Sequence, residues 1–290
     1  MSETVQKYYP SVLQAIHLLI LYIFIQTLVD FPLAIIDYYK DTEYMYHPVK
    51  KVLSGVGSTI FILVYGYKKM KVPFLKVFSF NFFNPLIVVA IVTFFWGMHN
   101  LLGKVSLWVE KVIPAPAWFW EMFGKILESD NNWWGAFMRV AIIAPVVEEL
   151  IFRGIILQGF RRNYSAFVSV FMSALLFALF HLNPWQFPAT FILGLLLGWI
   201  MIMNNNILLA IIGHSINNLM VLLSITYSEE ISTMRIFSLE SNAVMLVSAV
   251  MAIVSLGLIY VFSMPRFKIN RSIKPSNSWI IKKTQKWITF

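Results

Sequence analysis

Cysteine is absent from the sequence, which excludes a disulfide framework, a thiolate metal site and a cysteine nucleophile. Charge is scarce as well. Charged residues make up 13% of the chain and hydrophobic residues 59%, whereas a soluble domain has about 25% charged residues. The sequence also has no Rossmann glycine pattern, phosphate-binding loop or zinc-finger spacing. These absences favour a polytopic membrane protein.

The apolar runs are long enough to cross a bilayer, which takes about 20 mostly apolar residues per helix. Eight such runs predict an all-α protein of about eight transmembrane helices, with residues 1–290 forming a single membrane domain. The predicted spans are Val12–Ile36, Val52–Tyr67, Pro85–Leu102, Trp133–Phe160, Ser165–Leu182, Trp185–Met203, Ile207–Tyr227 and Ala243–Met264.

The net charge of +9 is divided unequally between the two sides of the membrane. If the spans alternate, one side carries 14 basic residues and one acid, and the other carries 7 basic and 10 acidic residues. The positive-inside rule places the basic side in the cytoplasm, so both termini are predicted to be cytoplasmic. The tail at residues 265–290 holds seven of these basic residues, and we expect it to contact anionic lipid rather than nucleic acid.

Three charged residues, Glu148, Glu149 and Arg153, lie near the middle of the span Trp133–Phe160, where a charge is costly and usually functional. Glu149 and Arg153 are four residues apart on one helix face, which predicts a supporting ion pair. Glu148 points about 100° away from Glu149. Its surroundings therefore differ, and it is the better candidate for a catalytic base.

Polar side chains recur in two later spans, at His181 and at His214 with Asn218. His214 and Asn218 share a helix face, and Asn217 is the weaker candidate because it points to the side. We expect structural or interfacial roles for the remaining histidines and for the other intramembrane acid, namely His17, His47, His99 and Asp30.

Two kinds of chemistry fit these side chains. A carboxylate and a histidine can activate water as a nucleophile, while a second histidine and an amide donate hydrogen bonds to an oxyanion. Alternatively, Glu148, His181 and His214 could bind zinc and leave one position open for water. The sequence has no H-E-x-x-H motif. The residues alone leave both alternatives open.

The order of these motifs resembles that of a known family. Glu148-Glu149-x-x-x-Arg153, Phe177-x-x-x-His181 and His214-x-x-x-Asn218 are similar to the motifs of the CAAX-protease and bacteriocin-processing family, also called the Abi family, of intramembrane proteases. The resemblance covers roughly residues 141–222 and implies a catalytic core at about residues 133–227. It implies that Glu148 and His181 activate water and that His214 and Asn218 form the oxyanion hole, without a metal being favoured.

The expected function is therefore hydrolysis of a peptide bond in a membrane-associated or lipid-modified peptide. One alternative is a non-catalytic immunity or regulatory protein that binds a peptide toxin or a sensor kinase. A proton-coupled transporter is less favoured, because two matching halves with broken helices are not evident. A chain rich in Lys, Asn and Ile without an organelle signal favours a bacterial plasma membrane. The substrate and the oligomeric state are left open.

Overall fold

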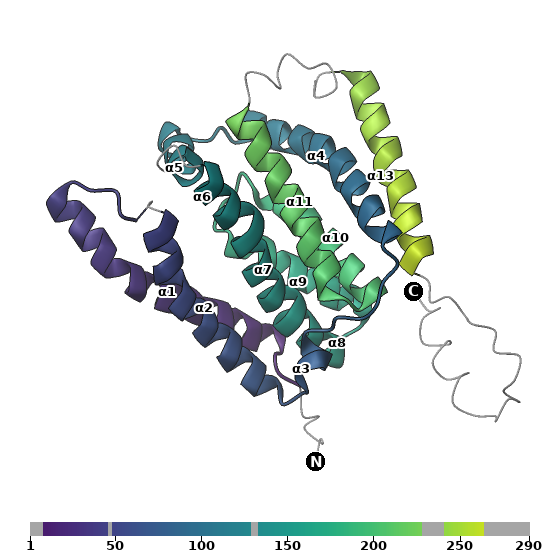
Figure 1. Ribbon diagram of the computed structural model, residues 1–290, viewed down its shortest axis with the longest axis horizontal. Coiled ribbons are helices and arrows are strands. Elements are labelled where there is room, and N and C mark those ends of the chain that lie inside the picture. Colours follow the sequence, from purple (N-terminus) through teal and green to yellow (C-terminus); the bar gives the residue numbers. More distant parts are fainter. Residues whose placement is uncertain (1–7, 46–47, 129–132, 228–240, 264–290) are drawn as a thin grey trace, which may run out of the picture.

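The computed structural model describes residues 8–45, 48–128, 133–227 and 241–263, and within these ranges it contains helices and no β-strand. The all-α class is thereby confirmed (Figure 1). The helices, apart from a long segmented one, are α1 (Val12–Lys40), α2 (Pro48–Met70), α3 (Phe74–Val77), α4 (Leu86–Val112), α5 (Ala117–Glu128), α9 (Ala166–Phe180), α10 (Phe187–Asn204), α11 (Ile207–Thr226) and α13 (Asn242–Ser263). The predicted basic tail lies outside the described residues.

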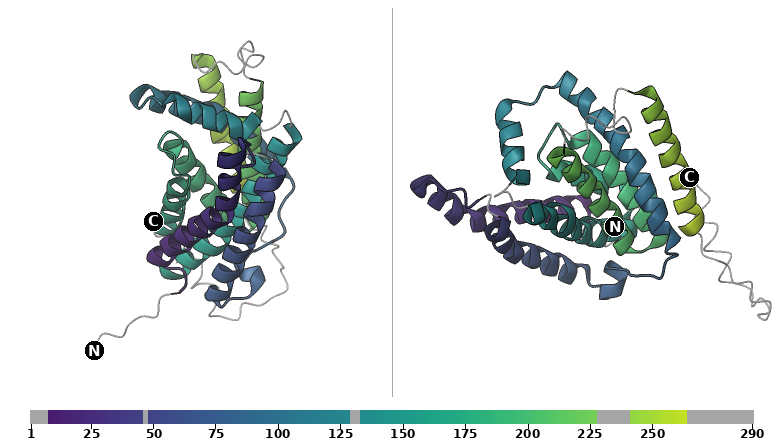
Figure 2. Two further views of the ribbon diagram at one scale, coloured as in Figure 1. Left: turned by 90° about the vertical axis from the view of Figure 1, so that its left-hand side faces the viewer. Right: turned by 45° about the horizontal axis from the view of Figure 1, so that its top comes forward.

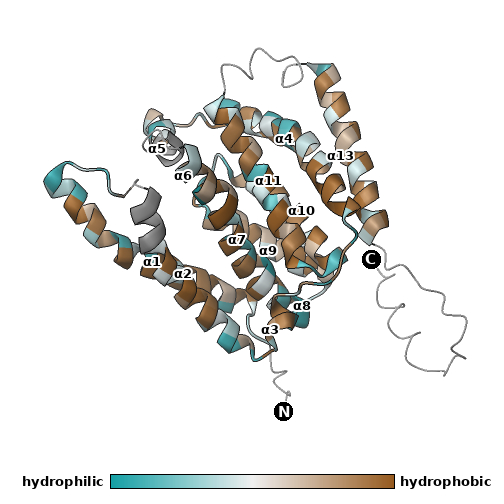
Figure 3. Cartoon of the chain, in the orientation of Figure 1, coloured by the Kyte–Doolittle hydropathy of each residue, from teal (hydrophilic) through white to brown (hydrophobic). Residues whose placement is uncertain are grey.

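Five helices are long and apolar enough to cross a membrane, namely α1, α4, α10, α11 and α13. Their outward faces carry large apolar side chains, and hydrophobic residues, coloured brown, predominate along α13 (Figure 3). Phe24 on α1 is 58% exposed and Ile253 on α13 is 70% exposed. An apolar surface of this extent indicates contact with lipid, which confirms a membrane protein.

The other three predicted spans are helical but differ from a plain transmembrane helix. Four lysines reduce the hydropathy of α2, and α9 has only 15 residues. The span predicted at Trp133–Phe160 is a helix divided into segments. The number of eight transmembrane helices therefore stays a prediction.

This long helix runs through α6 (Trp133–Phe137), α7 (Ala144–Glu149) and α8 (Leu157–Asn163), with two π-helical segments between them. The π segments are η2 (Met138–Ile143) and η3 (Leu150–Ile156). A proline inside an α-helix collides with the carbonyl group four residues earlier. Pro145 is the second residue after the end of η2, so the wider π turn lies where the proline would otherwise collide. Single π turns inside α-helices are rare overall, and those that occur are often found at functional sites.

Most of the long helices pack as pairs. Helix α1 packs against α2, α9 against α10 and α4 against α13, while α11 contacts α4, α10, η2 and α7. Two further views show the long helix between the α1–α2 pair and α11 (Figure 2). Polar residues carried by the long helix and by α11 therefore meet inside the bundle.

Candidate active site

A cavity of about 530 Å³ brings the four candidate catalytic residues together. Glu148 of α7, His181 at the C-terminal end of α9, and His214 and Asn218 of α11 all line it. With a rise of 1.5 Å per residue, the 15 residues of α9 extend about 22 Å. This is less than the roughly 30 Å of a hydrocarbon core. The short helix thus places His181 at a depth where Glu148 can share its cavity.

Glu149 and Arg153 form the predicted ion pair behind the cavity wall. The distance from Arg153 Nη1 to Glu149 Oε1 is 2.8 Å, and both side chains are almost fully buried. Arg153 Nη2 also donates to the carbonyl oxygen of Gly194 at 3.0 Å, and the guanidinium lies 4.7 Å from the centre of the Phe177 ring. The arginine therefore links the long helix to α9 and α10.

His214 extends this buried network to the cavity. Its Nδ1 lies 2.8 Å from Glu149 Oε1, where an ionised carboxylate accepts the Nδ1–H. Its Nε2 lies 3.9 Å from Glu148 Oε2. Glu149 therefore supports Arg153, as the sequence predicts, and also orients the histidine that faces Glu148.

The two glutamates differ in exposure. The side chain of Glu148 is 22% exposed and that of Glu149 is fully buried. Glu148 Oε2 is itself buried and has no hydrogen-bond partner among the described residues. Glu148 is thus the carboxylate that a molecule in the cavity can reach, while Glu149 is already bound to two cationic or polar side chains.

His181 is held by the last turn of α9. Its Nδ1 lies 2.8 Å from the carbonyl oxygen of Phe177, and the two aromatic rings are 4.8 Å apart in an edge-to-face arrangement. A carbonyl oxygen only accepts hydrogen bonds, so the proton of the neutral imidazole resides on Nδ1. Nε2 then has its lone pair available to a molecule in the cavity.

Asn218 binds the backbone of the first π segment. In η2 the N–H of Ala144 bonds to the carbonyl oxygen of Arg139, five residues earlier. The same pattern would pair Val140 with Pro145, which has no N–H. Asn218 Nδ2 donates to the Val140 carbonyl oxygen instead, at 3.0 Å. This hydrogen bond uses one of the two protons on Asn218 Nδ2 and does not use the other.

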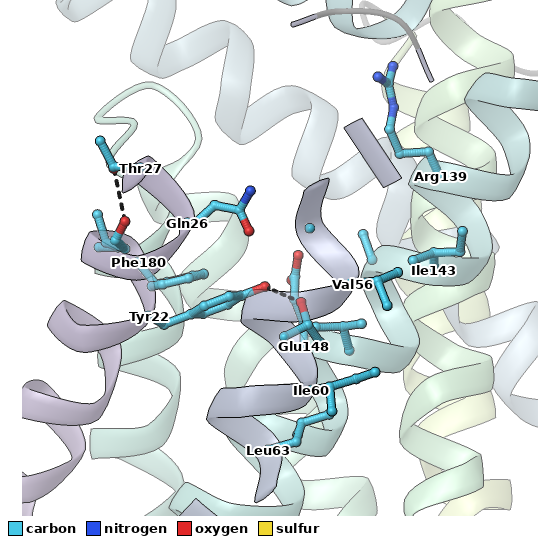
Figure 4. A pocket seen from close by; sticks show the side chains of 15 residues that line it. Tyr22, Gln26, Thr27, Val56, Ile60, Leu63, Arg139, Ile143, Glu148 and Phe180 are labelled. Atoms are coloured by element: carbon cyan, nitrogen blue, oxygen red, sulfur yellow. Dashed lines mark hydrogen bonds between the residues drawn. The ribbon is translucent and has the colours of Figure 1, made fainter. Parts of the chain in front are cut away.

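A second cavity of about 620 Å³ shares Glu148, Arg139 and Ala144 with the first, and Figure 4 shows the side chains that line it. It lies between α1, α2 and the long helix, and its walls are mostly apolar, with Ile60 and Leu63 near Glu148. The Tyr22 hydroxyl of α1 is hydrogen-bonded to Thr59 of α2 at 2.8 Å, beside the glutamate. Glu148 is therefore accessible from two directions.

Sequence reasoning missed some residues that line these cavities. His99, expected to be structural or interfacial, lines the first cavity, and its Nε2 is 2.8 Å from the Ser224 hydroxyl. Asn217 lines it as well and donates to Asn218 Oδ1 at 3.2 Å. Arg139 lines both cavities. Its charge within a predicted span was the signal that could have identified it.

The zinc alternative requires Glu148, His181 and His214 to converge. Across the described ranges, no group of three or more His, Asp or Glu residues is arranged to hold a metal ion.

Comparison with known proteins supplies independent information about the same region. Residues 130–220 match the model of the Rce1-like family, described as type II CAAX prenyl endopeptidase Rce1-like. Neither the curated proteins nor the solved structures gave a match. The matched residues contain the long helix, its two glutamates, His181, His214 and Asn218. The match over residues 130–220 confirms the resemblance of this region to the CAAX proteases.

Proposed function

We propose that this protein hydrolyses a peptide bond of a membrane-associated or lipid-modified peptide, using Glu148, His181, His214 and Asn218. The observation that carries the proposal is their convergence on one cavity from three helices. The family match supports a peptidase in general, and the assignment of roles to side chains is ours.

Glu148 and His181 act on the attacking water. Glu148 takes one proton from the water, and His181 Nε2 accepts a hydrogen bond from the other O–H. The hydroxide equivalent then adds to the scissile carbonyl carbon. Glu148 returns the proton to the departing amine nitrogen, so that no covalent enzyme intermediate forms. General acid–base catalysis of this kind contributes roughly 10²–10⁴-fold to the rate.

His214 and Asn218 stabilise the oxyanion. The second proton of Asn218 Nδ2 supplies one donor. His214, whose Nδ1 is held by Glu149, directs its Nε2 towards Glu148 and supplies the other donor from that atom. Each such donor contributes roughly 3–4 kcal/mol. We propose that this set works without a metal.

The second cavity suggests the class of substrate. Its walls are largely apolar and lead to Glu148, so an apolar or lipid-bearing part of the substrate fits there while the peptide lies across the first cavity. A prenylated peptide is the first substrate to test, because the matching family is described as a prenyl endopeptidase. We place the enzyme in a bacterial plasma membrane with both termini in the cytoplasm.

Replacing Glu148 with Gln tests the proposal. We expect cleavage of a prenylated peptide to fall at least about 100-fold with unchanged yield and thermal stability, measured by mass spectrometry of the products. Glu110→Gln is the matched control, because Glu110 lines neither cavity and should keep full activity. Full activity of Glu148→Gln would contradict the mechanism. Activity that survives dialysis against EDTA would support a metal-free reaction.

A further inference from the structure

Arg139 is a charged residue that has no role in the proposed catalytic mechanism. It lies in the π segment η2 and lines both cavities. Figure 4 shows its guanidinium turned away from Glu148, so the two charges do not neutralise each other. The nearest precedent in the same helix is Arg153, which has both an acid and a carbonyl oxygen as partners.

Among the described residues, no carboxylate is paired with the guanidinium of Arg139. Its Nε and Nη2 are buried and lack a hydrogen-bond partner among the described residues. Arg139 as a whole is only partly buried, but removing these two nitrogen atoms from solvent without a partner costs free energy, and an intramembrane charge that persists is usually functional. A planar guanidinium presents paired N–H groups that match a carboxylate. The partner expected here is therefore an anion that arrives with a ligand.

We propose that Arg139 binds the C-terminal carboxylate of the peptide substrate. This inference rests on the proposed peptidase function. Nine residues of helix between Arg139 and Glu148 correspond to about 13 Å at 1.5 Å per residue. An extended peptide covers this length with roughly four residues. Binding of the carboxylate by Arg139 thus selects the C-terminal end of a peptide. It also fixes the distance between the scissile bond and the C-terminus.

Binding rather than cleavage provides the test, so that it stands even if the catalytic proposal fails. The protein carries Glu148→Gln and is placed in phosphatidylcholine nanodiscs. The probe is a fluorescent farnesylated peptide, prepared with a free C-terminal carboxylate and as the C-terminal amide. We expect the free acid to bind at least about tenfold more tightly than the amide, as for a charge-assisted pair. Adding Arg139→Gln should remove this preference and leave amide binding unchanged.

A matched control separates recognition from a general effect of charge. Arg162→Gln removes an arginine that lines neither cavity, and it should keep the preference for the acid. Arg139→Lys should retain part of it, because the charge remains and the paired donors do not. Equal binding of acid and amide to the parent protein, or equal loss of both in Arg139→Gln, would overturn the proposal. A preference that persists in Arg139→Gln would overturn it too.

A lipid phosphate is the competing anion, and the same proteins distinguish it. If phosphatidylglycerol raises the melting temperature of the parent protein but not that of Arg139→Gln, and neither protein discriminates acid from amide, the anion is a lipid headgroup and the proposal is wrong. If the melting temperatures respond alike to this lipid while the acid preference depends on Arg139, the carboxylate assignment is supported.

Discussion

Glu148 and Glu149 are neighbours in the chain with different surroundings. Glu149 accepts hydrogen bonds from Arg153 and His214 at 2.8 Å each, whereas Glu148 faces two cavities. The charge of Glu149 is compensated only while Arg153 is present. The stability of the site therefore depends on Glu149 and Arg153, and its proposed chemistry on Glu148.

Arg153→Gln is expected to destabilise the protein by about 3–5 kcal/mol, because it leaves the Glu149 carboxylate buried without its cation. The measurement is the melting temperature in detergent by tryptophan fluorescence. Arg161→Gln is the control, since Arg161 is partly exposed and, among the described residues, its side chain bonds only to Gln158. A melting temperature for Arg153→Gln equal to that of the control would contradict the supporting role.

The sequence predicted the Glu149–Arg153 pair, because a spacing of four residues fixes their geometry within one helix. It did not predict the contact between Glu149 and His214, whose residues are 65 positions apart. Helix periodicity describes which residues share a face and not which faces of distant helices meet. The bond from Asn218 to Val140 was missed for the same reason.

At the scale of elements, close contact between helices depends on small residues. A Cβ atom on Gly97 of α4 would lie 2.5 Å from the carbonyl oxygen of Ser248 in α13, so the two backbones would have to separate. Small residues at such crossings allow helices in membranes to approach.

Gly97→Ala is therefore expected to lower stability by about 1–3 kcal/mol, as overpacking does. Gly257→Ala is a control on α13 itself, because a Cβ there meets no atom within 4 Å. Alanine favours a helix by about 1 kcal/mol over glycine, so this control should match or exceed the parent protein in melting temperature. Equal melting temperatures for both variants would show that α4 and α13 do not restrain each other.

The hydropathy of the sequence predicted where the helices lie, but it did not predict the backbone geometry within the long helix. The all-α class followed from the length of the apolar runs. The π segments of the long helix were not predicted, because an apolar run looks alike in α and π geometry. The ends of α9 differed by only a few residues from the prediction of Ser165–Leu182. That short length matters most, since it sets the depth of His181.

At the scale of the whole molecule, the absence of cysteine allows the proposed topology to be tested with single cysteine variants. Lys40 at the end of α1 and Lys76 in α3 are both exposed. With both termini in the cytoplasm, Lys40→Cys lies outside the cell and Lys76→Cys inside. A membrane-impermeant maleimide should label only Lys40→Cys in intact cells and both variants in permeabilised cells. Labelling of Lys76→Cys alone in intact cells would reverse the orientation.

The meeting of two cavities at Glu148 has a kinetic consequence. A substrate whose apolar part occupies the second cavity is drawn from the bilayer, so its effective concentration is a mole fraction in the lipid rather than a molarity in water. Adding inert lipid at constant amounts of enzyme and substrate then slows turnover by surface dilution. Increasing the aqueous volume does not slow turnover in this way, because it leaves the mole fraction of substrate in the lipid unchanged. The rate of hydrolysis would therefore depend on the surface concentration of the substrate in the membrane.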